Sequence, residues 1–87
     1  MNFTSFEMTV SVQDDRFAGA VRVLVTSVAA QAGCGAPAAE AFAAAVEVAV
    51  RQRLLEVSAG VLIPIVVRRQ NGPVEVLVDG HTLTLEV

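Results

Sequence analysis

Residues 37–56 read PAAEAFAAAVEVAVRQRLLE, the longest strongly helical stretch of the chain. Proline suits the first turn of a helix, where no backbone N–H is required. Alanine is the best helix former, and its small side chain lets neighbouring elements approach closely. Apolar residues recur at helical spacing and define one face for a core: Phe42, Ala45, Val46, Ala49 and Val50. We therefore expect a helix from Pro37 to Glu56, with the rest of the chain organised around it.

A strand and another helix are expected before this stretch. Residues 3–12, FTSFEMTVSV, alternate between apolar and polar side chains, which predicts a half-buried strand. Asp14 and Asp15 then suit a helix N-terminus, and Gly33 suits the C-terminal end. The expected helix runs from Asp15 to Ala32, and its apolar face is made of Phe17, Val21, Leu24, Val25 and Val28.

A second strand is indicated by residues 61–67, VLIPIVV, which are continuous and rich in β-branched side chains. This pattern predicts a strand that is buried on both sides or lies in an interface. Pro64 has no N–H to donate to a sheet, so we expect an edge strand or a bulge there. Residues 70–73, QNGP, predict the turn that follows.

The end of the chain reads as a hairpin. Residues 74–78 and 81–87 are apolar strands separated by Asp79-Gly80, a signal for a two-residue turn. This turn sets Val78 opposite His81 and gives the two strands one shared core face: Val74, Val76, Val78, Leu83, Leu85 and Val87. The predicted fold is a single α+β domain over residues 1–87, in the order β-α-α-β-β-β. Two helices cover one face of a mainly antiparallel four-stranded sheet.

Composition excludes several function classes. The net charge is −3 and the six basic residues are all arginine, which argues against nucleic acid as a partner. No apolar run is long enough to span a membrane. The N-terminal segment has no basic region and carries Glu7 early, so we expect no signal peptide and a cytoplasmic protein. The apolar fraction of 54% leaves surplus apolar surface for a protein partner.

The residues that could carry out catalysis or bind a ligand are better explained by structural roles. Glu47 and Arg51 are four residues apart on the expected helix and predict a surface ion pair. His81 has no second ligand near it in the sequence, so no metal site is expected. Cys34 lacks a cationic neighbour that would activate its thiol. Gly33-x-Gly35 lacks the third glycine and the lysine of a phosphate-binding loop. We expect neither catalytic residues nor a cofactor.

Residues 14–50 resemble the start of the histidine-kinase-like (GHKL) ATPase domain in the anti-sigma-factor serine kinases. In that family the first strand is followed by a helix with a Val-Arg pair and then by a glycine break, here residues 20–22 and 33–35. The second helix ends in a motif of the type A-V-x-E-A-x-x-N. Residues 45–51, AVEVAVR, are its counterpart, with Arg51 in place of the final asparagine.

The resemblance implies an ATPase site in the parent family, where the glutamate supports a general base and the asparagine binds magnesium. A guanidinium has no acceptor atom, so Arg51 cannot ligate Mg²⁺ and instead neutralises Glu47. The family's Asp-x-Gly segment and lid would begin where this chain stops. The expected function is therefore a non-catalytic regulatory module, with partners of the sigma-factor, anti-sigma or antagonist type.

Two alternatives remain open from the sequence. One is an ATPase half-domain completed by a partner subunit. The other is a small-molecule-binding domain that uses the groove left by the nucleotide, lined by Glu47, Arg51 and the last two strands.

Self-association through the sheet is also expected, because two helices cover only one of its faces. The strand 61–67 would present one of its two apolar sets there, either Leu62 with Val66 or Ile63 with Ile65. Leu77 points away from the predicted core and would join that set. We expect a homodimer, or a complex with another protein, that buries these side chains.

Overall fold

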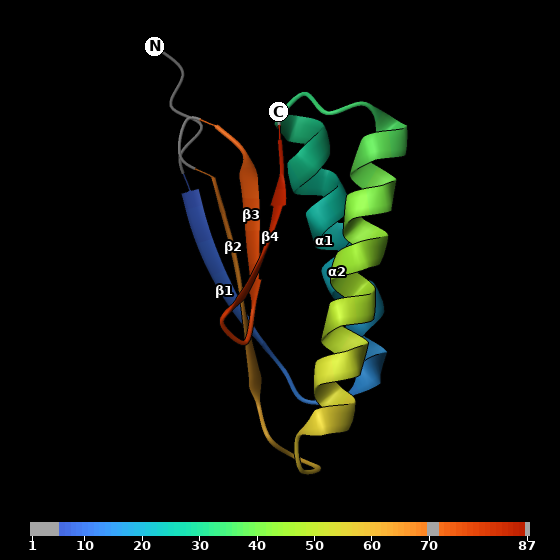
Figure 1. The fold of residues 1–87 in the computed structure, drawn as a ribbon, viewed down its shortest axis with the longest axis vertical. Coiled ribbons are helices and arrows are strands. Elements are labelled where there is room, and N and C mark those ends of the chain that lie inside the picture. The colour runs from blue at the N-terminus through green and yellow to red at the C-terminus, as the bar shows by residue number, and fades with distance from the viewer. Residues whose placement is uncertain (1–5, 70–71, 87) are drawn as a thin grey trace.

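The computed structural model of the protein describes residues 6–69 and 72–86, and it has the predicted order of elements (Figure 1). Strand β1 (Phe6–Val12) leads through a 3-10 turn (Asp15–Phe17) into the helix α1 (Ala18–Gln31). The second helix is α2 (Ala36–Glu56). The remaining strands are β2 (Ile63–Arg69), β3 (Val74–Val78) and β4 (His81–Leu85). Residues 3–5 of the first predicted strand, the turn residues 70–71 and Val87 lie outside the described residues.

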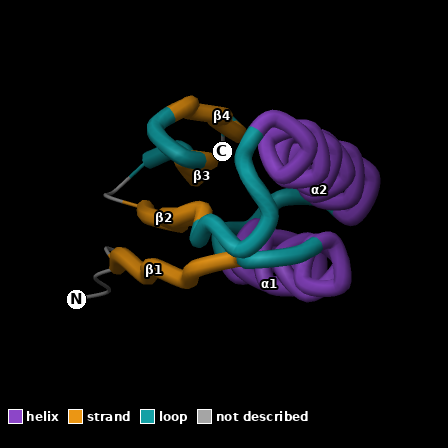
Figure 2. The backbone as a smooth tube through the Cα atoms, turned by 90° about the horizontal axis from the view of Figure 1, so that it is seen from below, coloured by secondary structure: helices purple, strands orange, loops and turns teal. Residues whose placement is uncertain are grey.

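The four strands form one antiparallel sheet in the order β1-β2-β3-β4. Both helices lie on one side of this sheet, α1 beside β1 and β2 and α2 beside β3 and β4 (Figure 2). The α+β class and the two-layer arrangement predicted from the sequence are confirmed.

Local sequence signals explain where the first helical segment begins and ends. The Asp14 carboxylate accepts a hydrogen bond from the backbone N–H of Arg16 at 2.9 Å, so Asp14 is the predicted N-cap. Gly33 follows α1 with a φ of 94°, a left-handed conformation that glycine adopts without steric cost.

The core lies between the helices and the sheet. In α2 the buried positions recur at helical spacing: Ala39, Phe42, Ala43, Val46 and Val50. They face an apolar set from the strands that includes Val12, Ile63, Ile65, Val67, Val74, Val76 and Val78. Two residues that were predicted to lie in the core are exposed instead. Phe17 is 50% exposed because it ends the 3-10 turn, and Ala45 is exposed because it falls beside the buried stripe of α2.

The hairpin between β3 and β4 is confirmed in its register and its turn. Val78 pairs with His81, and Val76 pairs with Leu83. The two turn residues both have positive φ, 49° at Asp79 and 90° at Gly80. This is the combination that a type I′ turn requires.

The prediction for Pro64 was wrong, because β2 is an inner strand between β1 and β3. Pro64 is the second residue of β2, and its carbonyl accepts a hydrogen bond from the N–H of Asp79 at 2.9 Å. In an antiparallel pair the N–H and C=O of one residue point toward the same neighbour. The missing N–H of Pro64 therefore lies on the β3 side, one residue before the first β2–β3 pair, Ile65 with Val78, where the chain enters the Asp79-Gly80 turn.

Candidate functional site

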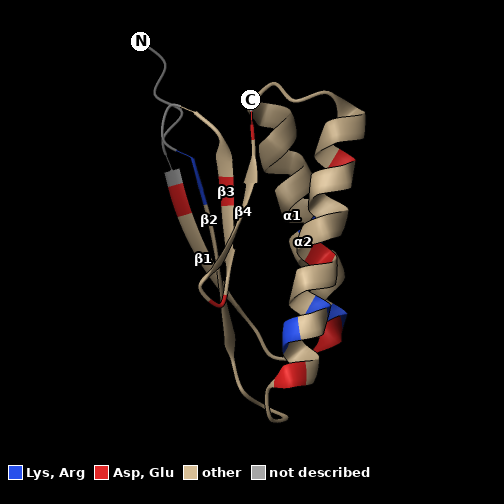
Figure 3. Ribbon diagram, in the orientation of Figure 1, with Lys and Arg blue, Asp and Glu red and all other residues tan. Residues whose placement is uncertain are grey.

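Glu47 is the centre of a charged cluster on the helix pair. Its side chain is only 15% exposed, and its Oε2 accepts hydrogen bonds from the Arg51 guanidinium at 2.8 and 3.2 Å. Its Oε1 accepts a hydrogen bond from Arg22 of α1 at 3.1 Å. Arg51 also lies 3.8 Å from the carboxylate of Asp15. Charged segments lie together in the lower half of the helix pair in Figure 3.

The sequence predicted the pair between Glu47 and Arg51 but missed Arg22. The i, i+4 spacing places the first two side chains on one stripe of α2. Arg22 comes from the other helix, which small side chains such as Ala18, Ala39 and Ala43 allow to pack closely against α2. Its approach depends on the packing of the helices, which no local spacing reveals.

The electrostatics of this cluster keep Glu47 ionised. Hydrogen bonds from Arg51, and next from Arg22, lower the pKa of the Glu47 carboxyl from its usual value. A general base works best with a pKa near the operating pH. A carboxylate with a lowered pKa and both oxygens bound to guanidinium groups is therefore poorly suited to accept a proton.

The other sequence candidates are placed apart from this cluster. His81 is exposed at the start of β4, and Cys34 is partly buried in the loop between the helices. Within residues 6–69 and 72–86, no three His, Cys, Asp or Glu side chains gather as a metal site. A cavity beside β3 and β4 is lined by residues that include Arg53 and Glu56, and neither Glu47 nor Arg51 borders it.

The predicted partner-binding residues fall on opposite faces of the sheet. Ile63 and Ile65 are fully buried under the helices, so including them as partner-binding residues was wrong. The pleat directs their neighbours to the uncovered face, where Val66 pairs with Leu77 and both are half-buried. Leu62 is 59% exposed and precedes β2.

The residues that lie beside Val66 and Leu77 on the neighbouring strands of the uncovered face are polar. Thr9 flanks Val66 on β1, and Thr82 flanks Leu77 on β4. In the next row Arg68 of β2 binds Glu75 of β3 at 3.1 Å. The apolar part of this face is therefore a small centre, Val66 and Leu77, inside a polar surround.

A further ion pair that the sequence did not suggest joins α2 to the hairpin. Arg53 Nε donates to the carboxylate of Asp79 at 2.6 Å. The contact holds the turn against the last part of α2. We interpret it as structural, because among the described residues the one further ionic contact of Arg53 is Glu56 at 3.6 Å.

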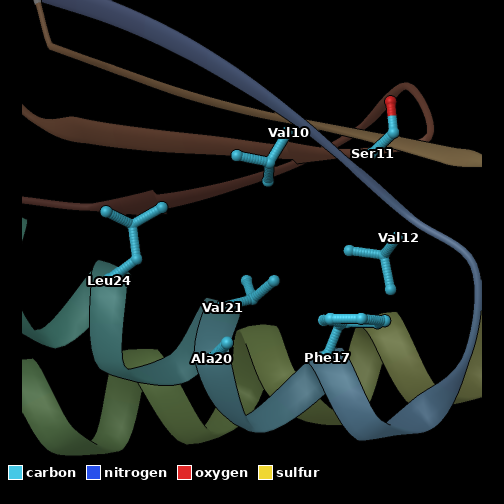
Figure 4. Close-up of a pocket in the computed structure, with 7 residues that line it drawn as sticks. All are labelled: Val10, Ser11, Val12, Phe17, Ala20, Val21 and Leu24. Atoms are coloured by element: carbon cyan, nitrogen blue, oxygen red, sulfur yellow. The ribbon is translucent and has the colours of Figure 1, made fainter.

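Two cavities lie between β1 and α1 and were not predicted. One, of about 220 Å³, is lined by Val10, Ser11, Val12, Phe17, Ala20, Val21 and Leu24. In Figure 4 the side chains of Val10 and Val12 point from the strand toward the helix, while Ser11 points away. The other, of about 360 Å³, continues along the same helix beside Met8, Leu24, Ser27, Val28 and Gln31. We call these two cavities together the β1–α1 groove.

Neither helix in the described part of the chain has the length and apolar character needed to cross a membrane. Comparison with family models, with curated proteins and with solved structures finds no match to this chain.

Proposed function

We propose that this chain is a non-catalytic protein-interaction module of a regulatory system, resembling an anti-sigma-factor serine kinase domain whose nucleotide site is disabled. The single observation that carries the proposal is the pairing of Glu47 with two guanidinium groups. The residue that would support a general base is neutralised. The position that would hold magnesium carries Arg51, which has no atom to offer a metal ion.

This proposal predicts that the chain does not bind nucleotide. Titration of the ¹⁵N-labelled protein with millimolar Mg-ATP or Mg-ADP is expected to leave the amide resonances around Glu47 unchanged. The variant Arg51→Asn is expected to behave in the same way, since Arg22 still holds Oε1 of Glu47. Saturable shifts in the wild type that disappear in Glu47→Gln would contradict the proposal and favour an ATPase half-domain.

The uncovered sheet face is the proposed contact surface for a second copy of the chain. Val66 and Leu77 are adjacent at its centre. Both helices lie on the opposite side of the sheet (Figure 2). A two-fold axis through this pair would lay the same apolar centre of each copy against the other, which is the usual form of a symmetric dimer. Leu62 lies beyond the start of β2 and would extend the contact.

We expect the wild type to sediment as a dimer and Leu77→Glu to sediment as a monomer, because a buried unpaired carboxylate is costly. Val48→Glu is the matched control, since Val48 is an apolar residue 53% exposed on α2. It should remain dimeric. A wild type that stays monomeric at the highest soluble concentration would exclude this contact surface.

A further inference from the structure

The outer edge of β1 offers unpaired backbone groups to a partner. The carbonyl of Pro64 faces β3, so the next residue, Ile65, directs its backbone groups toward β1. The backbone N–H and C=O of its partner Val10 therefore point toward β2. The backbone groups of the alternate residues of β1 point outward, away from the sheet. Among the described residues no strand pairs with this edge. The outward N–H and C=O groups belong to Glu7, Thr9 and Ser11.

The β1–α1 groove lies directly beside this edge and carries no charge on its lining side chains. Met8 borders one of its cavities, and Val10 and Val12 border the other. Successive residues of this set are two positions apart, a step of about 6.6 Å along a strand. Alternate side chains of an added strand have the same spacing, so they would enter the two cavities in turn. The two cavities, of about 220 and 360 Å³, lie below and at the lower end of the range for a small-molecule pocket, about 300–1,000 Å³.

The other outer strand, β4, also has an unpaired edge, but it lacks an uncharged groove beside that edge. The cavity beside β4 is lined in part by Arg53, Glu56 and His81. An apolar segment bound there would remove water from these charged side chains without replacing it, which costs free energy. The observations therefore favour β1 over β4 as the site of strand addition.

A second copy of the chain would bring its own helices to this edge. Antiparallel pairing of two β1 strands about a two-fold axis would set them about 4.8 Å apart with both helix layers on the same side of the joined sheet. The α1 helix of each copy lies near β1 (Figure 2), so the two helices would face each other across the groove and cover its opening. A single extended segment brings no helix with it and leaves the groove free for its own side chains.

We propose that β1 binds an extended, neutral segment of a partner protein as a fifth strand, with alternate aliphatic side chains in the β1–α1 groove. The segment pairs with the backbone of Glu7, Thr9 and Ser11. The residues that face Met8, Val10 and Val12 carry the aliphatic side chains. This inference rests on the proposed role as an interaction module and names the surface that recognises the partner.

The test uses a blocked heptapeptide with glutamine at both ends, valine at positions two, four and six, and threonine at positions three and five. We expect saturable binding to the wild type with a Kd below about 1 mM. Hydrogen exchange followed by NMR should show new protection at the amides of Thr9 and Ser11. The methyl resonances of Val10 and Leu24 should shift.

Backbone pairing makes a sharper prediction for two modified peptides. In the proposed register the threonine amides face β1 and the valine amides face solvent. Methylation of the threonine amide nitrogens should weaken binding at least tenfold. Methylation of the valine amide nitrogens should leave the ladder intact and change the Kd much less.

Two protein variants test the same surface. Thr9→Pro removes an outward N–H without touching the β1–β2 ladder, and Ala20→Glu places a charge at the first cavity. Each should weaken peptide binding at least tenfold. Ala45→Glu, at an exposed alanine of α2, is the matched control and should bind normally.

Equal binding of the two methylated peptides, protection outside β1, or no saturable binding would each overturn the inference. None of these outcomes bears on nucleotide binding or on the Leu77→Glu experiment. A failed strand addition is thus distinguishable from a failure of the proposed function, which saturable Mg-ATP binding would reveal.

Discussion

Replacing Ile65 by alanine is expected to lower the free energy of unfolding by about 2–5 kcal/mol. Ile65 is fully buried and belongs to the core between the sheet and the helices. Truncation leaves a cavity that β2 cannot close, because this strand is held on both sides by β1 and β3. Domains of this kind have total stabilities of about 5–15 kcal/mol, so the loss is a large share of the whole.

Urea unfolding followed by circular dichroism measures this effect, with Leu62→Ala as the control. Leu62 is 59% exposed and also aliphatic, so at a protein concentration low enough for the chain to be monomeric its truncation should change stability by less than about 0.5 kcal/mol. Equal losses for the two variants would mean that the face of the strand has been assigned wrongly. Ile65→Val should fall between them, at about 0.5–1.5 kcal/mol.

The contrast between these two residues marks the limit of what the sequence predicts. Alternation within residues 61–67 defines two apolar sets, but the whole stretch is apolar, so the pattern cannot say which set faces the helices. The choice is made by pairing with β1, more than fifty positions away, where Val10 lies opposite Ile65. It also sets Pro64 in an inner strand, which its chemistry alone argues against.

Elements with local signals were predicted closely. The Asp79-Gly80 turn fixes the register of β3 and β4 because a two-residue loop leaves one way to pair the strands. The helix around residues 37–56 follows from alanine content and a proline in its first turn, and α2 differs from it by one residue at its start. The candidate site could be predicted only in part. The pair between Glu47 and Arg51 is local, whereas Arg22 and the β1–α1 groove arise only when separate elements pack.

Gly80→Val is expected to destabilise the domain by about 1–3 kcal/mol, with the cost arising in the backbone. Gly80 has a φ of 90°, a conformation that β-branched residues strongly disfavour. A Cβ atom added there would meet no heavy atom within 4 Å, so a direct clash of that atom is not the cause. The turn cannot relax freely, because Asp79 is bound to Pro64 through its N–H and to Arg53 through its carboxylate.

Two controls separate this strain from other effects in thermal and urea unfolding. Asp79→Asn keeps a residue that tolerates positive φ and removes only the partly exposed ion pair to Arg53, so it should cost less than about 1 kcal/mol. Gly19→Ala, within α1, should stabilise the domain by about 0.5–1 kcal/mol, since its Cβ would also meet open space. A melting temperature of Gly80→Val that matches the wild type would show that the turn does not require positive φ. The register of β3 and β4 would then need another explanation, because the type I′ turn is what sets Val78 opposite His81.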